Sequence, residues 1–151
     1  MAARRALEPF ERGAAGEGPY QVQYALQEMM QDLVGIVRNE PEMRQALAGL
    51  QALRERASRA GVGGHREYNP GWHAALDLPN LLTVSEAIAR CAIERKESRG
   101  GHFRDDYPDK DQTYATFNLV VRKGRDGAME ISRAPIPEMP AELRQIIEEM
   151  K

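Results

Sequence analysis

The sequence is poor in metal-binding and disulfide-forming residues. It has a single cysteine, Cys91, and its three histidines (His65, His73 and His102) lie far apart in the chain. One cysteine cannot form an internal disulfide, and the histidines lack the close pairs that bind one zinc ion. We therefore expect no metal site. Cys91 falls within a predicted apolar helix stripe, which favours a buried, inert thiol over a nucleophile.

A strong net charge and long apolar runs are also lacking. The 151 residues include 21 Lys and Arg against 23 Asp and Glu, a formal net charge of -2. This balance produces no overall field toward nucleic acid, and no run approaches the roughly 20 apolar residues that span a bilayer. We expect one globular domain with a cytoplasmic location, no nucleic-acid partner and no direct membrane insertion.

No strand-like segment is followed by the Gly-x-Gly-x-x-Gly turn that binds the phosphates of flavin and nicotinamide cofactors. The two glycine clusters, 13–18 and 61–64, have a different spacing and are typical of linkers. We expect no cofactor in this chain. Residues 1–19 are small, charged and Gly-rich, and they are predicted to form a flexible N-terminal arm or linker.

Three segments place apolar residues at helical spacing, over about residues 20–38, 40–60 and 77–98. Asn39 can cap the second helix, and Asp77 can cap the third. The buried side of the third helix is predicted to consist of Leu81, Val84, Ile88, Cys91 and Ala92. The short joint between the first two helices predicts that they pack as an antiparallel pair. With the third helix, the predicted fold class is mainly α, with a three-helix, spectrin-repeat-like bundle.

The remaining chain has a different pattern. Apolar and polar residues alternate on both sides of a Gly-bearing turn, which predicts a small C-terminal β-hairpin over about residues 116–133. Pro135, Pro137 and Pro140 predict an extended tail, and residues 141–150 predict one short terminal helix.

Trp72 is predicted to lie in the connection before the third helix. A lone Trp has a large apolar surface that is rarely left in water. Two interpretations stay open: its side chain closes the end of the bundle, or it docks onto another domain.

The densest polar segment covers residues 94–108, where Arg99, His102 and Arg104 surround a Gly-Gly break. A run of charged residues is most often a solvated surface. The same turn could instead present guanidinium and imidazole groups to carboxylates or carbonyls of a facing surface.

This segment carries a family resemblance. The string Arg95-Lys-Glu-Ser-Arg-Gly-Gly-His-Phe-Arg-Asp-Asp-Tyr-Pro108 closely resembles the Glu-Ser-Arg-Gly-x-His-x-Arg-x-Asp-Tyr-Pro signature of the C-terminal domain of succinate dehydrogenase and fumarate reductase flavoprotein subunits. Further segments follow the family's order, at residues 26–30, 34–38, 50–53 and 82–90. L-aspartate oxidase shares the Glu-Ser-Arg-Gly core but usually has an uncharged residue at the position of Arg104. The resemblance therefore favours the dehydrogenase branch.

The resemblance implies that the parent subunit interconverts succinate and fumarate with FAD, which a large N-terminal domain holds. The family's catalytic motifs precede the matched region, so no catalytic or cofactor-binding residue is assigned to this chain, and the chain alone is expected to be inactive. The implied partners are the FAD-binding domain of the same subunit and the iron-sulfur subunit. The implied location is the cytoplasmic face of the inner membrane.

Within this interpretation, residues 20–151 form the helical C-terminal domain of the flavoprotein. Its expected role is structural. Arg99, His102 and Arg104 are the candidates for polar docking, with Trp72 and Tyr107 as apolar anchors. Replacing Arg104 by Ala in the full subunit is expected to weaken assembly or activity and to leave the isolated bundle folded. The alternatives are a stand-alone helical interaction module and the corresponding domain of L-aspartate oxidase.

Overall fold

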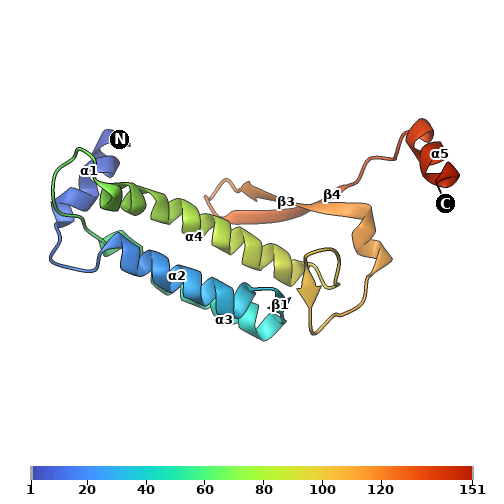
Figure 1. Ribbon diagram of the computed structural model, residues 1–151, viewed down its shortest axis with the longest axis horizontal. Helices are drawn as coiled ribbons and strands as arrows, with labels where there is room; N and C mark the ends of the chain where they lie inside the picture. The colour runs from blue at the N-terminus through green and yellow to red at the C-terminus, as the bar shows by residue number, and fades with distance from the viewer. Residues whose placement is uncertain (1, 151) are drawn as a thin grey trace. The chain divides into compact units, whose positions relative to one another are not determined.

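The computed structural model describes residues 2–150, and the chain divides into two compact units, residues 1–110 and 111–151 (Figure 1). The first unit consists of α1 (Ala2–Arg12), α2 (Pro19–Val34), β1 (Val37–Arg38), α3 (Glu40–Arg59), α4 (Pro70–Glu94) and β2 (Phe103–Arg104). The second consists of a 3-10 turn, η1 (Gln112–Thr116), then β3 (Phe117–Lys123), β4 (Met129–Pro135) and α5 (Ala141–Glu149).

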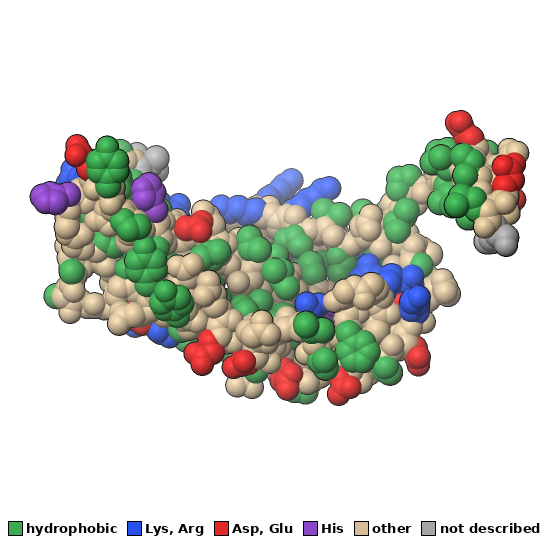
Figure 2. Space-filling model, in the orientation of Figure 1, with side chains coloured by type: hydrophobic (Ala, Val, Ile, Leu, Met, Phe, Trp, Pro, Cys, Tyr) green, Lys and Arg blue, Asp and Glu red, His purple; other side chains and the backbone are tan. Residues whose placement is uncertain are grey.

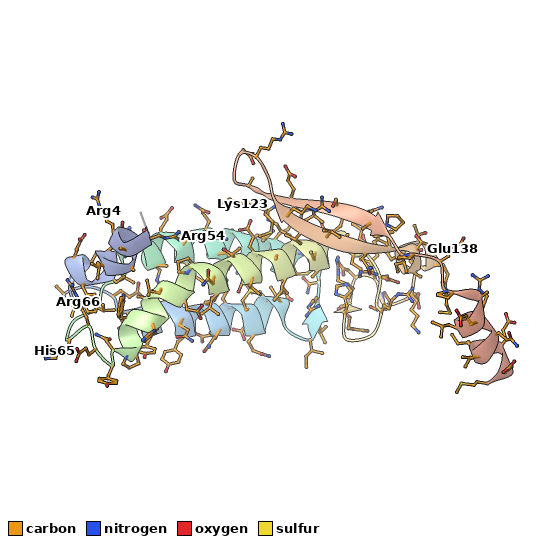
Figure 3. The ribbon with its side chains drawn as sticks, turned by 90° about the horizontal axis from the view of Figure 1, so that it is seen from above. Arg4, Arg54, His65, Arg66, Lys123 and Glu138 are labelled. Atoms are coloured by element: carbon orange, nitrogen blue, oxygen red, sulfur yellow. The ribbon has the colours of Figure 1, made fainter. Side chains whose placement is uncertain are left out.

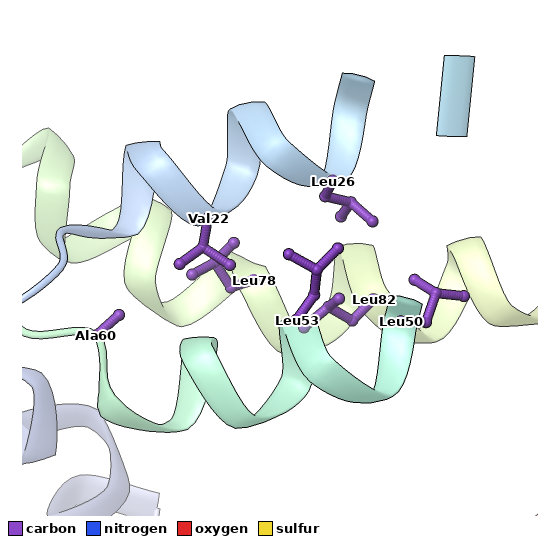
Figure 4. Close-up of a cluster of buried hydrophobic side chains, with 7 residues drawn as sticks. All are labelled: Val22, Leu26, Leu50, Leu53, Ala60, Leu78 and Leu82. Carbon is purple, nitrogen blue, oxygen red and sulfur yellow. The ribbon is translucent and has the colours of Figure 1, made fainter. Parts of the chain in front are cut away.

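Helices α2, α3 and α4 lie side by side and bury their apolar sides against one another (Figures 1 and 3). One core cluster combines Val22, Leu26, Leu50, Leu53, Ala60, Leu78 and Leu82 (Figure 4). A second cluster combines Val34, Met43, Ala46, Ala89 and Ala92. Each Val, Leu or Met side chain in these clusters contributes roughly 1.5–3 kcal/mol when it leaves water. The predicted mainly α fold with a three-helix bundle is confirmed.

Helix α2 ends at Val34, four residues before the predicted end. The next residues do not continue the helix because Val37 and Arg38 form a short parallel ladder with Phe103 and Arg104. The backbone N–H of Asp105 also donates to the carbonyl of Arg38 at 2.8 Å. The end of α2 is thereby joined to the segment that follows α4.

Helix α3 begins as predicted: Oδ1 of Asn39 accepts a hydrogen bond from the N–H of Glu42 at 3.0 Å. The C-cap residue of α3 is Ala60, and Gly61 follows it. A side chain at Gly61 would place Cβ 2.0 Å from the carbonyl oxygen of Gly13. Gly61 is therefore required by the close approach of the N-terminal segment.

The predicted start of the third helix at Asp77 is wrong, because α4 begins at Pro70. Oδ1 of Asn69 accepts from the N–H of Trp72 at 3.0 Å, and Pro70 occupies the first turn, where it needs no donor. Pro79 lies inside the helix and leaves one backbone hydrogen bond unmade. The helix ends at Glu94 rather than near Ser98.

The predicted buried side of α4 is only partly correct. Ala92 is buried, whereas Val84 is 57% exposed, Ile88 is 45% exposed and Cys91 is partly exposed. The buried positions on α4 are Leu78, Leu82, Ala89 and Ala92. Because α4 carries apolar residues on more than one side, periodicity alone did not identify the side that faces α2 and α3.

The predicted arm over residues 1–19 is corrected by α1, which covers Ala2–Arg12. Its contacts fix it to the start of α4: the ring of Phe10 lies 5.4 Å from that of Trp72, and Nε1 of Trp72 donates to the carbonyl of Ala6 at 2.7 Å. Glu17, which follows α1, forms an ion pair with Arg56 of α3. A helix of 11 residues is marginal on its own in water, so its apolar contact with α4, far away in sequence, stabilises it.

The second unit contains the predicted hairpin. Strands β3 and β4 pair antiparallel from Phe117 opposite Pro135 to Lys123 opposite Met129. Gly127 has φ +85° in the turn, a conformation that favours glycine. The extended tail leads to α5, whose apolar residues Leu143, Ile146, Ile147 and Met150 are all exposed.

Candidate functional site

Residues 94–108, called the signature loop here, fold around the side chain of Arg104. This side chain is fully buried. Its Nε and Nη2 donate to the two carboxylate oxygens of Asp106, both at 2.6 Å. Its Nη1 donates to the carbonyl of Ala92 at 2.7 Å, with Ile93 and Arg95 carbonyls at 3.2 and 3.3 Å. A cation among the last carbonyls of α4 also matches the negative end of the helix dipole.

A second buried charge, Glu97, orders the start of the loop. Its side chain is fully buried and accepts from Nη1 of Arg95 at 2.6 Å. Arg99 donates to both of its oxygens, from Nε at 2.9 Å and from Nη2 at 3.0 Å. Two arginines thus compensate one buried carboxylate, as a charge removed from water requires.

The hydroxyl of Ser98 forms hydrogen bonds that hold the two ends of the signature loop together. The hydroxyl accepts from the N–H of Arg104 at 2.8 Å and donates to the carbonyl of Tyr107 at 2.8 Å. Between these residues, Arg99 and His102 exchange two backbone hydrogen bonds, and Gly100 has φ +60° in the turn. Residues with a Cβ disfavour that φ, so glycine is the favoured residue at position 100.

His102 connects the loop to the end of α2. Its Nδ1 lies 3.0 Å from Nη1 of Arg38, and its Nε2 lies 3.1 Å from the carbonyl of Arg95. Because a guanidinium can only donate and a carbonyl can only accept, this arrangement requires a neutral imidazole protonated on Nε2. Burial and the nearby Arg38, Arg104 and Arg95 cations hold the pKa of His102 below its ordinary value.

The carboxylate of Asp106 is held in its charged form by Arg104. Its hydrogen bonds to Arg104 lower the pKa of Asp106 from 3.8 to about 2. Its Oδ2 also accepts from the N–H of Glu40 at 3.0 Å, which brings the start of α3 to the loop. The signature loop is therefore held against α2, α3 and α4 together.

Acid titration tests this ion pair. A carboxylate with a lowered pKa stabilises the fold above its unfolded value, and the contribution is lost as the pH falls through the folded value. We expect the free energy of unfolding to fall between about pH 4 and pH 2, and Asp106→Asn to remove part of that dependence. Denaturant unfolding at several pH values measures the difference. If the free energy of unfolding depends on pH in the same way for Asp106→Asn and for the original chain, the ion pair does not contribute as stated.

The five predicted docking residues fall into two groups. Arg99 and Tyr107 are partly exposed on the signature loop. The guanidinium of Arg104 stacks 5.0 Å from the Tyr107 ring but is itself inaccessible. The expectation for Arg104 therefore changes, because its contacts hold this unit together. His102 is likewise engaged by Arg38, and Trp72 lies at the start of α4 against α1.

Sequence reasoning missed Arg38, Glu97 and Ser98. Arg38 was assigned to a helix, although its Nε donates to the carbonyl of Gly35 at 2.8 Å and its Nη1 reaches His102. Glu97 and Ser98 belong to the family signature, but the sequence pattern predicted no role for them. One acid between two nearby arginines is a signal that could have indicated a charge cluster.

The glycine clusters and the possible metal-binding side chains can now be placed in the fold. The two glycine clusters follow α1 and α3, not strands, so neither fits the phosphate-binding turn of a flavin domain. Residues 2–150 contain no group of three His, Cys, Asp or Glu side chains that could hold a metal ion. Burial raises the pKa of the Cys91 thiol, which disfavours the reactive thiolate. Over the same residues, no helix combines the length and the apolar character needed to cross a membrane.

Comparison with known proteins decides the family. The family model described as the C-terminal part of the fumarate reductase flavoprotein matches residues 23–146. The chain belongs to this family. The match includes α2 from residue 23 onward, all of α3 and α4, and the signature loop, so it confirms the resemblance inferred from the loop sequence.

Relatives agree with this assignment. The chain is 30% identical over 136 residues to the fumarate reductase flavoprotein subunit of Mycobacterium tuberculosis, covering 89% of this chain and 23% of the relative. It is 38% identical over 131 residues to the succinate dehydrogenase flavoprotein subunit of Coxiella burnetii, covering 85% and 22%. The chain thus spans about a quarter of the length of these flavoprotein subunits.

A solved structure has the same fold. A chain of the Mycobacterium smegmatis Sdh1 complex with UQ1 superimposes with a TM-score of 0.85 at 43% identity, covering 97% of this chain and 25% of that one. The L-aspartate oxidase of Yersinia pestis is 39% identical, but only over 90 residues, 58% of this chain. The dehydrogenase and fumarate reductase branch is favoured over L-aspartate oxidase, as the sequence predicts.

Proposed function

We propose that this chain is a structural domain that docks onto the flavin-bearing remainder of a succinate dehydrogenase or fumarate reductase flavoprotein subunit. The parent reaction is the FAD-dependent interconversion of succinate and fumarate. The chain alone is inactive, since the residues that bind FAD and the substrate belong to the remainder. The observation that carries this proposal is an exposed apolar surface on a family member that is a quarter of its relatives' length.

The exposed apolar residues of α4, β1, β2 and the residue before β1 are together called the apolar ledge here: Ile36, Val37, Val84, Ile88 and Phe103. Ile36 is 78% exposed, and it lines a shallow hollow between α2 and α4 together with Ile88. Val37 and Phe103 are partners in the β1–β2 ladder, and Val84 precedes Ile88 by one turn. Figure 2 shows hydrophobic side chains on the surface over α2 and α4.

An apolar ledge supports docking because exposed apolar side chains gain free energy when a partner covers them. A core of apolar residues with a polar rim is also the usual composition of an interface. Here the adjacent signature loop contributes Arg99 and the ring of Tyr107, both partly exposed. We assign these two to the docking rim. Arg104, His102 and Trp72 act within this chain.

The iron-sulfur subunit is the second proposed partner. The second unit favours this, since α5 leaves the apolar residues Leu143, Ile146, Ile147 and Met150 exposed along one helix. An isolated two-stranded hairpin is also marginally stable without a covering surface. In the assembled complex, the subunit would lie at the cytoplasmic face of the inner membrane.

A binding experiment with Ile88→Asp tests the docking surface. The partner is the M. smegmatis Sdh1 flavoprotein subunit truncated to lack the matched quarter, and this chain is titrated onto it. We expect binding of the original chain and about tenfold or greater weakening by Ile88→Asp, because a carboxylate would be buried in an apolar contact. Circular dichroism of the variant should be unchanged, since Ile88 lies outside both core clusters.

Tyr68→Asp is the matched control. Tyr68 is also an exposed apolar side chain, but it lies in the connection before α4 and has φ 51°, which Asp tolerates better than Tyr. It should bind like the original chain. Equal binding by Ile88→Asp would remove the ledge from the interface, and no binding by any form would favour the stand-alone interaction module.

A further inference from the structure

His102 is the one histidine of the described chain that joins separate elements. Its imidazole is half-buried between β1, the end of α4 and β2. One ring nitrogen contacts the guanidinium of Arg38 at 3.0 Å, and the other contacts the carbonyl of Arg95 at 3.1 Å. A proton on Nδ1 would remove the acceptor of Arg38 and place two cations in contact.

The charges around His102 make that protonation unfavourable. Arg38 faces it from β1, Arg95 from the end of α4 and Arg104 from β2, and all three disfavour the imidazolium. Three carboxylates of this region already face arginines. Glu97 binds Arg95 and Arg99, Asp106 binds Arg104, and Glu40 at the start of α3 binds Arg44.

We propose that His102 is a pH-sensitive clasp, which holds the signature loop to the end of α2 when neutral and releases it when protonated. Release would separate the β1–β2 ladder, whose Asp105 N–H donates to the carbonyl of Arg38. Arg104 would keep the loop tied to α4 through the carbonyl of Ala92. The opening is therefore local, and it moves Val37 away from Phe103.

Hydrogen exchange of the Asp105 amide tests the clasp in the chain alone, so the result does not depend on the docking proposal. Between pH 7 and pH 5, we expect the protection factor to fall by up to about tenfold per pH unit, the limit for uptake of one proton on opening. His102→Gln, which can donate and accept but cannot titrate, should show no such dependence. The control variant His65→Gln should behave like the original chain, because His65 is an exposed residue in the connection between α3 and α4 (Figure 3).

Direct titration of the His102 imidazole by NMR provides a readout that needs no variant. The sign follows from the environment: the folded pKa lies below 6.5, so the stabilising contribution is full above 6.5 and declines as the pH falls below it. A His102 resonance that titrates at or above 6.5 would overturn the proposal. An unchanged pH dependence in His102→Gln would overturn it as well.

Discussion

Replacing Arg104 by Ala should lower the free energy of unfolding by roughly 2–4 kcal/mol, because it removes a fully buried side chain and hydrogen bonds to a charged group, which contribute roughly 1.5–3 kcal/mol each. The guanidinium is fully buried, and its removal takes away the charged donor to the carbonyl of Ala92 and both Arg104 hydrogen bonds to Asp106. Denaturant unfolding followed by circular dichroism measures the change. The expectation drawn from sequence is that Arg104→Ala leaves the isolated bundle folded, and the burial of the side chain adds an expected loss of stability in the isolated chain.

Arg44→Ala is the control for this prediction. Arg44 also pairs with a carboxylate, Glu40, but one helical turn away and with its own side chain 64% exposed. Such surface pairs contribute little, so stability should barely change. Arg104→Lys should be intermediate, because an ammonium keeps the charge but cannot form the paired contacts with Asp106. Equal stability of Arg104→Ala and Arg44→Ala would contradict the internal role of Arg104.

The second large effect concerns the two apolar sides of α4. Leu82→Ala should lower the free energy of unfolding by about 2–5 kcal/mol, because it opens a cavity in the core cluster of Figure 4. Val84→Ala, two residues along the same helix, should change it by less than about 0.5 kcal/mol because Val84 is exposed. Denaturant unfolding of the two variants compares the sides directly. A larger loss for Val84→Ala would mean that the core assignment is wrong.

The bundle could be predicted because its apolar spacing and its Asn39 cap are local features. The start of α4 could not be distinguished in the same way. Asn69, Pro70 and Gly71 are all common in turns, yet Asn69 caps a helix here, as Asn39 does in α3. Helix α1 escaped prediction for a different reason, since its ordering depends on Trp72, which is remote in sequence.

The burial of charged side chains in the signature loop could not be predicted from the sequence. Its letters identified the family, but a dense charge run is usually solvated, and nothing local indicated that Arg104 and Glu97 are fully buried. Their burial depends on tertiary partners: the last carbonyls of α4 for Arg104, and two arginines for Glu97. Likewise, the contact between His102 and Arg38 requires α2 to end early, which periodicity did not predict.

The most direct test of the account is a chimera in which this chain replaces the matched C-terminal quarter of the flavoprotein subunit of the M. smegmatis Sdh1 complex. Flavin absorbance and co-purification of the other subunits would be measured against the parent and against a truncated subunit. We predict that the chimera retains both, whereas the truncated subunit does not. A chimera that behaves like the truncated subunit, while the isolated chain is folded, would contradict the proposal that this domain completes a flavoprotein.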